Sequence, residues 1–481
     1  MMVTVATAVA EENPKREFRG AWMSTIYQPQ YAKQSTEQNK RYLCRQLDEL
    51  LEAGCNAVIF QVRPQADALY ASPYEPWSRH LTGRAGRAPS PMWDPLEFMV
   101  EECHKRGMEL HAWLNPYRVT TTAKETLPKS HIYHRHPERF VRYNGRLYFD
   151  PALPENREFI ATIVKDIITR YDVDAIHMDD YFYPYPVAGQ EFPDDESYSR
   201  YGKGMKRADW RRHNVDLLIE LIHNVIVKER PWVRFGISPF GIWRNKKSDP
   251  RGSDTNGLQN YDDLYADVLK WTEEGWVDYM MPQLYWPLEH KRASSRVLAA
   301  WWNDHANGRH MYFGQDVKAT MDHPEGKAPN QLNAKIDLSR RLPNVQGNCW
   351  WPAYELTGNY KDVADRLEAD RQSTIALVPA YTWLNNKLPE EVRDLVVIDH
   401  KVTWERAPIN NPMRQQHRFV VYAFPENARM DITNPEFILA VTPDTTYELP
   451  SWLHGRYTIV VTALDRVNNE SAYGSFVNCK L

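Results

Sequence analysis

The stretch 174–186 reads Asp-Ala-Ile-His-Met-Asp-Asp-Tyr-Phe-Tyr-Pro-Tyr-Pro. In it a short apolar run stops at two adjacent carboxylates, Asp179 and Asp180, and four aromatic residues and two prolines follow within six positions. An apolar run that ends in acids is typical of a buried parallel strand whose carboxyl end opens into a site. Aromatic rings beside carboxylates suit a sugar, because the rings cover its apolar C–H face while the acids hydrogen-bond its hydroxyl groups or act on its glycosidic bond.

The same pattern of an apolar run followed by a longer amphipathic stretch recurs on both sides of this segment. Eight such runs are found, at 19–25, 57–63, 108–115, 175–180, 234–239, 279–285, 311–316 and 346–351. They are apolar along most of their length, as expected for parallel strands covered by helices. Ser35 and Gln38 form a capping box before the first intervening stretch, and Gly54, Gly107 and Gly275 precede later runs, where glycine closes a helix.

Repeated strand–helix units predict an α/β fold, with a closed (β/α)8 TIM barrel over residues 18–385. An open doubly wound sheet is the alternative, but no glycine-rich phosphate loop follows the first run. After about residue 385 the runs alternate as strands do, without a helical period, and we predict a small all-β sandwich over 386–481. Residues 457–471 resemble the end of a fibronectin type III domain, in which Trp404 would fill the core.

Composition excludes several classes of function. The 481 residues carry a formal net charge of −4 with both signs interspersed, so we expect no nucleic-acid partner. The 17 Trp and 27 Tyr fit carbohydrate binding, although large barrels also use Trp as core filler. No stretch is long and apolar enough for a transmembrane segment. Five scattered cysteines without a C-x-x-C pair argue against a disulfide framework and against a structural zinc site.

The first residues are typical of the end of a secretion signal. Ala8-Val9-Ala10 matches a small-x-small cleavage site, so we interpret residues 1–17 as a leader and expect an exported protein, periplasmic or extracellular. The positive segment that normally begins such a signal is missing, which we interpret as truncation. A leader without any targeting role is the alternative.

The site of a (β/α)8 barrel lies at the carboxyl ends of its strands, so polar and aromatic residues there are candidates. We take Asp179 and Asp180 as the catalytic candidates. The predicted substrate-binding residues are Arg63, Asp67, Tyr70, His111, Trp113, Asn115, Arg118, His177, Tyr181, Tyr183, Ser238, Trp243, Gln283, Tyr285, Trp286, Trp351 and Glu355.

Strand alternation predicts which of these side chains point inward. The set expected to face the barrel mouth is His111, Trp113, Asn115, His177 and Asp179. Asp180 lies at the strand–loop junction, where alternation does not fix its direction, so we expect Asp179 to be the more buried acid. Adjacent acids raise each other's pKa and favour one ionised and one protonated member. The alternative is that one acid is structural and bonds Arg63.

Metal and serine chemistry are not expected at this site. His177, Asp179 and Asp180 are plausible ligand types, but metal-dependent hydrolases of this fold usually carry a His-x-His pair on the first strand, and none is present here. No Gly-x-Ser-x-Gly elbow occurs either. We therefore expect no catalytic metal and no other cofactor.

Several motifs together resemble one family of bacterial envelope proteins, the glycosyl-hydrolase-like 10 family. They are FRGAW at 18–22, QVRPQADALY at 61–70, HAWLNPYR at 111–118, DAIHMDDYFYP at 174–184 and MPQLYW at 281–286. The resemblance covers about residues 16 to 360 and implies a (β/α)8 fold, export and cleavage of a glycan. It also implies a peptidoglycan-type, N-acetylated substrate, because characterised relatives include a glycosidase that acts on peptidoglycan strands lacking stem peptides. Some members carry a C-terminal β-sandwich, which could bind a cell-envelope protein partner.

The mechanism stays open at the level of sequence. A second carboxyl group could be Asp67, Asp316 or Glu355, or the pair itself could supply both. A third route uses the substrate's own N-acetyl amide as nucleophile, with Tyr285 assisting, by analogy with chitinase-like barrels. The competing functions are a non-catalytic glycan-binding barrel and, more weakly, a metal-dependent deacetylase or esterase.

Overall fold

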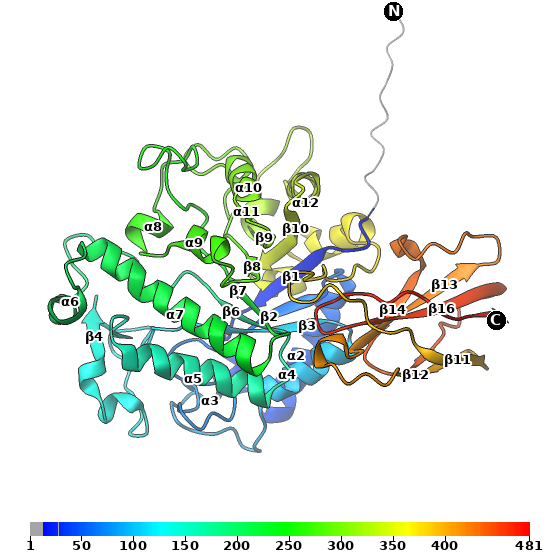
Figure 1. The fold of residues 1–481 in the computed structure, drawn as a ribbon, viewed down its shortest axis with the longest axis horizontal. Helices are drawn as coiled ribbons and strands as arrows, with labels where there is room; N and C mark the ends of the chain where they lie inside the picture. The colour runs from blue at the N-terminus through cyan, green and yellow to red at the C-terminus, as the bar shows by residue number, and fades with distance from the viewer. Residues whose placement is uncertain (1–12, 27) are drawn as a thin grey trace, which may run out of the picture.

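The computed structural model describes residues 13–26 and 28–481. Residues 1–12 of the predicted leader 1–17 lie outside the described residues, whereas residues 13–17 are described and Arg16 forms a bridge with Leu377. The chain forms a closed barrel of parallel strands followed by a small region of antiparallel sheets (Figure 1). Around the barrel the strands follow the order β1-β10-β9-β8-β7-β6-β3-β2. Their bounds are β1 (Phe18–Met23), β2 (Ala57–Arg63), β3 (Glu109–Leu114), β6 (Ala175–Met178), β7 (Arg234–Ile237), β8 (Tyr279–Met280), β9 (His310–Asp316) and β10 (Val345–Trp351). The predicted TIM barrel is confirmed.

Helices cover the outside of the barrel, and α5 and α7 lie side by side along one flank (Figure 1). The helices are α1 (Gln30–Lys33), α2 (Thr36–Glu52), α3 (Arg79–Thr82), α4 (Pro95–Lys105), α5 (Pro154–Arg170), α6 (Asp195–Tyr201), α7 (Arg207–Glu229), α8 (Asn260–Asp263), α9 (Val268–Glu273), α10 (Ser295–Asp304), α11 (Val317–Met321), α12 (Leu332–Arg341), α13 (Ala353–Thr357) and α14 (Val363–Arg366). Within the described residues, no helix is both long and apolar enough to cross a bilayer. The shorter helical turns are η1 (Ile132–His134), η2 (Pro137–Arg139), η3 (Tyr360–Asp362), η4 (Leu367–Arg371), η5 (Pro412–Arg414) and η6 (Pro435–Phe437).

Local signals fix where these elements begin and end. Ser35 and Gln38 form the predicted capping box at the start of α2. Gly54 and Gly107 have φ of 82° and 69°, the left-handed conformation that glycine adopts without strain. The predicted strand 279–285 is shorter than expected, because Pro282 has no N–H to donate and the ladder continues beyond Met280 only as isolated bridges.

One hairpin was not predicted. The strands β4 (Phe140–Tyr143) and β5 (Arg146–Phe149) pair with each other in the long connection between β3 and α5. A bridge between Arg118 and Tyr148 ties this hairpin to the end of β3. The hairpin therefore reaches the mouth of the barrel, where Arg146 contributes to the pocket described below.

The C-terminal strands form two antiparallel sheets. One contains β11 (Arg393–Ile398), β12 (Lys401–Glu405) and β15 (Thr446–Glu448), and the other contains β14 (Ile438–Thr442), β13 (Arg418–Pro425), β16 (Arg456–Leu464) and β17 (Phe476–Lys480). A shared core joins them, and Trp404 is 3% exposed within it, as predicted. The small all-β region is confirmed, whereas its relation to fibronectin type III domains and the boundary at 385 stay predictions.

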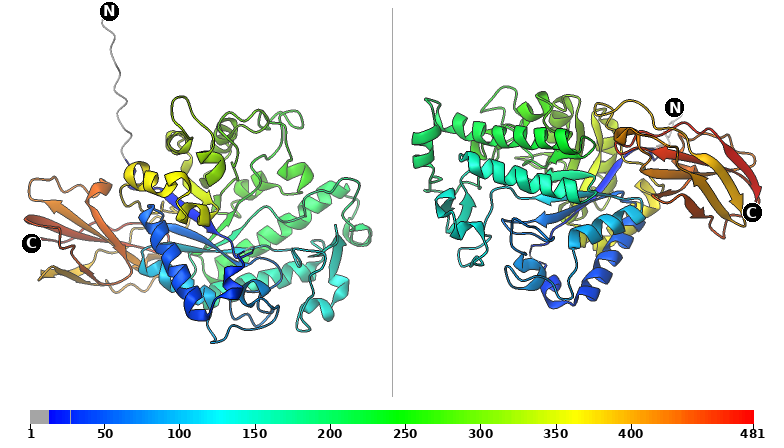
Figure 2. Two further views of the ribbon diagram at one scale, coloured as in Figure 1. Left: turned by 180° about the vertical axis from the view of Figure 1, so that it is seen from behind. Right: turned by 60° about the horizontal axis from the view of Figure 1, so that its bottom comes forward.

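These sheets lie against the amino-terminal end of the barrel, as all three views show (Figures 1 and 2). Arg418 Nη2 and Asn468 Nδ2 donate to Glu109 Oε1 over 3.0 and 2.9 Å at the start of β3. The contact is close enough that a Cβ on Gly107 would lie 2.3 Å from the carbonyl oxygen of Val441. The C-terminal sheets therefore cover the floor of the barrel.

Candidate active site

An open pocket of about 510 Å³ lies at the carboxyl ends of the barrel strands. It contains both acids of the stretch 174–186 together with several aromatic rings. The lining residues are Trp22, Ser24, Ile26, Gln28, Gln61, Trp113, Arg118, Thr121, Arg146, Asp179, Asp180, Tyr181, Ser238, Gln283, Tyr285, Trp351 and Tyr354. The pocket thus lies where this fold carries its active sites.

Asp179 is fixed from neighbouring strand β3, as alternation predicted. Trp113 Nε1 donates to its Oδ2 over 3.1 Å, and Asn115 Nδ2 donates to its Oδ1 over 2.5 Å. The backbone N–H of Tyr181 adds a contact of 3.3 Å to Oδ1. Burial raises the pKa of Asp179, and the charge of Arg118 and the bond from Asn115 offset part of that rise. The carboxyl group is therefore held in one orientation by donors that stabilise its ionised form.

Asp180 is held from its own loop and from the segment that follows β8. The Tyr185 hydroxyl donates a short hydrogen bond to its Oδ2, and the Gln283 side chain also bonds the carboxyl group. Burial and the neighbouring charge of Asp179 raise the pKa of Asp180 to about 7. The expectation that Asp179 would be the more buried acid is wrong: the two are 5% and 3% exposed, because the loop after the strand returns Tyr185 onto Asp180.

The predicted substrate-binding residues that line the pocket with the two acids are Trp113, Arg118, Tyr181, Ser238, Gln283, Tyr285 and Trp351. The Arg118 guanidinium lies 4.2 Å from the centre of the Tyr181 ring. Trp113 and Trp351 meet edge to face, with ring centres 6.2 Å apart. Flat rings on several sides of two acids are the arrangement that a sugar ring requires.

His111 and His177 lie below the pocket, inside the barrel. Trp22 Nε1–H donates to His177 Nε2 over 3.1 Å, so the proton of a neutral His177 is on Nδ1, 3.0 Å from the hydroxyl oxygen of Tyr279. The Tyr279 hydroxyl lies 2.8 Å from His111 Nδ1, and His111 Nε2 lies 3.0 Å from Glu109 Oε2. When both imidazoles are neutral, each group donates a hydrogen bond to the next one toward the floor: His177 donates to Tyr279, Tyr279 to His111, and His111 to Glu109. Both ring nitrogens of His177 are engaged, which leaves neither for a metal ion.

Three predicted residues, at the end of β2 and in the loop after it, are buried away from the pocket lining. Arg63 is fully buried, and its Nη2 lies 2.6 Å from Glu75 Oε1. The alternative that Arg63 bonds one of the acids is therefore wrong, because Glu75 takes that place. Asp67 is buried, which raises its pKa to about 8, and Tyr70 is fully buried as well.

The other predicted residues also lie outside the pocket lining. Tyr183 is 1% exposed and packs on Phe192, and Trp243 is 2% exposed and stacks on Trp301. Trp286 is half-buried against Phe240.

The remaining candidates for a second carboxyl group have other partners. Glu355 forms a 2.6 Å ion pair with Lys318, and the Asp316 side chain caps α11 by accepting from the N–H of Ala319. Among the described residues that line the pocket, Asp179 and Asp180 are the only carboxylates.

Sequence reasoning missed part of the lining. Trp22 and Gln61 stand at or near the ends of β1 and β2, so the strand-end rule could have included them. Arg146, Thr121 and Tyr354 come from connections that fold back over the mouth. Tyr185, the partner of Asp180, lies in the aromatic stretch but follows two candidate tyrosines and was not singled out.

The family profile and the sequence relatives of this chain agree with each other. The family profile described as glycosyl hydrolase-like 10 matches residues 17–328. The chain is 38% identical to "Glycosyl hydrolase YngK" of Bacillus subtilis (strain 168), covering 96% of this chain and 93% of that protein. It is 36% identical to "Glycosyl hydrolase DigH" of Escherichia coli (strain K12), covering 70% of this chain and 83% of that protein. Among solved structures, the PgaB (BpsB) glycoside hydrolase domain from Bordetella bronchiseptica aligns with a TM-score of 0.48 at 15% identity, over 74% of this chain and 99% of that one.

Proposed function

This chain belongs to the glycosyl hydrolase-like 10 family, and we propose that it hydrolyses glycosidic bonds of an N-acetylated, peptidoglycan-type glycan in the pocket at the barrel mouth. The observation that carries the proposal is the pair of buried carboxyl groups, one with a pKa raised to about 7, in a pocket walled by aromatic rings. A glycosidase needs a carboxylic acid that stays protonated near neutral pH beside a second group that stabilises positive charge.

Asp180 is the proposed general acid. Its pKa of about 7 leaves a large protonated fraction at neutral pH, so it can give a proton to the departing glycosidic oxygen. The donors Tyr185 and Gln283 then stabilise the carboxylate that this transfer leaves behind. In the second half of the reaction the same carboxylate takes a proton from the attacking water.

The nucleophile proposed is the acetamido oxygen of the substrate. A protein nucleophile or base would be a second carboxyl group about 5 Å or roughly 6.5–9.5 Å from the acid. The described lining residues offer only the adjacent Asp179, which Trp113 and Asn115 hold in an orientation suited to receive the amide N–H. In this scheme the amide oxygen attacks the anomeric carbon as the bond to the leaving oxygen breaks. Water then reopens the cyclic intermediate, with net retention of configuration.

The test compares glycan strands lacking stem peptides with cello-oligosaccharides, whose sugars carry a hydroxyl in place of the acetamido group. We expect reducing ends from the first substrate only, with the β configuration in the initial product by NMR. Asp179→Asn and Asp180→Asn should abolish release and leave binding of the strands measurable. Inverted product, or equal cleavage of both substrates, would overturn the substrate-assisted mechanism. Wild-type protein that binds strands without cleaving them would establish a glycan-binding barrel instead.

A further inference from the structure

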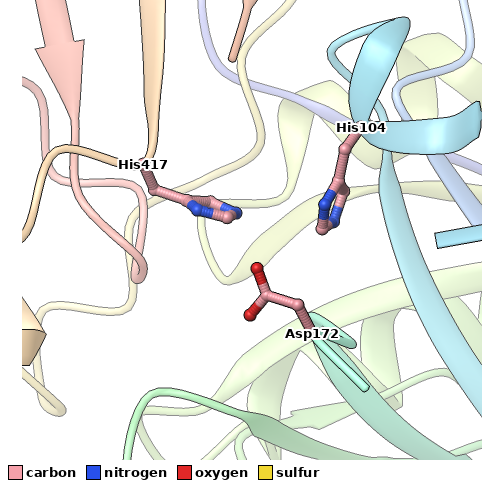
Figure 3. Close-up of side chains that lie close together, drawn as sticks. All are labelled: His104, Asp172 and His417. Atoms are coloured by element: carbon pink, nitrogen blue, oxygen red, sulfur yellow. The ribbon is translucent and has the colours of Figure 1, made fainter. Parts of the chain in front are cut away.

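Three side chains from distant parts of the chain converge at the amino-terminal end of the barrel, opposite the pocket (Figure 3). His104 lies in α4, Asp172 lies between α5 and β6, and His417 immediately precedes β13 of the C-terminal sheets. One potential ligand atom from each residue lies within 4.8 Å of the other two. Two of the ligands thus come from the barrel and one from the all-β region.

We propose that His104, Asp172 and His417 bind a zinc ion that joins the barrel to the C-terminal sheets. Two imidazoles and one carboxylate are nitrogen and oxygen ligands that zinc accepts, and a water molecule completes four-fold coordination. Tetrahedral bonds of about 2.0–2.1 Å place ligand atoms roughly 3.4 Å apart, so the side chains must close in by about 1 Å. The absence of cysteine pairs that argued against structural zinc bears only on thiolate ligands.

The residues around the cluster supply the outer contacts that a zinc site needs. His104 Nε2 lies 2.9 Å from Asp174 Oδ2, and a carboxylate on one ring nitrogen orients the imidazole and leaves the other nitrogen for the ion. Arg466 Nη1 donates to Asp172 Oδ1 over 2.6 Å, which leaves Oδ2 of that carboxylate. Both barrel ligands are therefore held in place by neighbours before any ion binds.

His417 is the feature that an ion-pair network without metal does not explain. Its side chain is 12% exposed, and Nε2 lies 3.9 Å from Asp174 Oδ1, beyond hydrogen-bond distance. In the described part of the chain, its ring forms no hydrogen bond, although it meets the His104 ring edge to face at 5.3 Å. The mostly buried His417 imidazole faces the His104 imidazole and the Asp172 carboxylate across the space that an ion would fill (Figure 3).

The local charges allow a cation. Arg418 is paired with Glu109 over 3.0 Å and Arg466 with Asp172 over 2.6 Å. Asp174 lies 3.9 Å from Arg234, which also pairs with Glu109, so the carboxylates and the guanidinium groups around the cluster balance each other.

Zinc binding by the full-length protein tests the proposal without using the catalytic reaction. Metal-stripped protein is dialysed against buffered Zn²⁺ and the bound metal is measured by mass spectrometry. We expect one zinc per wild-type chain and a rise in the thermal midpoint on zinc addition. His104→Ala and His417→Ala should each weaken binding by about 100-fold or more, and Asp174→Asn by about 10- to 100-fold. The matched control is His454→Ala, which removes an exposed histidine of the same C-terminal region and should change nothing.

Arg466→Ala separates a metal site from an ion-pair network. Because Arg466 occupies one oxygen of Asp172, its removal should keep the stoichiometry and tighten zinc binding several-fold. Co²⁺ bound in place of zinc should give the visible absorption of a tetrahedral ion, lost in His417→Ala. The proposal is overturned if wild-type protein binds no more zinc than the His104→Ala/His417→Ala double variant, or if Arg466→Ala abolishes binding.

Discussion

Both ends of the barrel bury carboxyl groups among imidazoles and aromatic rings, but the pKa values of these groups are shifted in opposite directions at the two ends. At the floor, burial alone would raise the pKa of Glu109, yet Arg234, His111 and Arg418 bring it below its ordinary range. At the mouth, Asp180 keeps the raised pKa that burial and Asp179 impose. Among the described residues, no cationic side chain forms an ion pair with either acid of the mouth. Acids that buried arginines keep ionised hold the structure together, whereas an acid whose pKa stays raised, such as Asp180, is available for proton transfer.

The largest expected effect comes from replacing Asp180, the acid at the barrel mouth that gives its proton to the substrate. Asp180→Asn should lower kcat/KM by about 10²- to 10⁴-fold, the usual contribution of a general acid. The matched control is Asp67→Asn, because Asp67 is also buried with a raised pKa, of about 8, but lies outside the pocket lining. Steady-state rates of reducing-end release distinguish the two. Equal losses in both variants would mean that burial, and not position in the pocket, determines the effect.

At the floor the corresponding change should damage stability instead of chemistry. Glu109→Gln leaves the buried guanidinium groups of Arg234 and Arg418 without their carboxylate, a loss of about 3–5 kcal/mol in the free energy of unfolding. Denaturant titration measures it. Glu426→Gln breaks the exposed pair with Arg456 and should change the free energy of unfolding little. If Glu109→Gln is as stable as wild type, the floor acid is not structural.

The pH dependence should have opposite signs at the two ends. Because Asp180 must carry its proton, kcat/KM should fall about tenfold per unit as the pH rises above about 7. At the floor, Glu109 and Asp174 have lowered pKa values, so the stability they contribute is present at neutral pH and is lost as the pH falls below the range of ordinary carboxyl groups. A pH series of kcat/KM and of unfolding midpoints tests both expectations. A kcat/KM that rises through pH 8 would contradict the assignment of Asp180 as the acid.

The Asp180→Asn variant should also gain a little stability, in contrast to the loss of stability expected for Glu109→Gln. The pKa of Asp180 is raised in the folded state, so its ionised form destabilises the fold as the pH rises from the ordinary carboxyl range to about 7, and fully above that. Asp180→Asn should therefore stabilise the protein at pH 8 by about 1–2 kcal/mol while it abolishes activity. Unfolding in denaturant at pH 8 and pH 4 measures the difference, which should vanish at pH 4. Destabilisation at pH 8 would show that the Tyr185 contact outweighs the buried charge.

The sequence predicted those parts of the molecule that depend on neighbours along the chain. Alternation placed Trp113, Asn115 and Asp179 together because consecutive strand residues point to opposite faces, and the pairing of β3 with β6 then brings their inner faces into contact. The capping box at Ser35 and the shape of the barrel follow from similarly local rules. The length of β8 departs from the prediction because Pro282 interrupts the ladder, and the β4–β5 hairpin was not predicted.

Partners that the chain supplies from a distance could not be predicted. Arg63 was predicted as a site residue, but the loop after β2 places Glu75 beside it, and the two form a buried ion pair. Arg146 reaches the pocket only through the β4–β5 hairpin, and His417 reaches His104 only because the C-terminal sheets dock on the floor. Alternation gives the face of a strand on which a side chain lies, but not the residue that another segment places opposite it.

The smallest expected effect concerns the hydrogen-bond chain that runs between the two ends. Trp22→Phe keeps an aromatic ring in the pocket wall but removes the N–H that His177 Nε2 accepts over 3.1 Å. The loss of one buried hydrogen bond should cost about 1 kcal/mol of stability, and a less firmly held ring should raise KM several-fold with little change in kcat. His177 can respond by moving its proton to Nε2, which would pass the change through Tyr279 toward His111. The imidazole ¹⁵N shifts of His111 measure this transfer; if they are unchanged in Trp22→Phe, the two ends of the barrel are independent and the contrast between them rests on local charge alone.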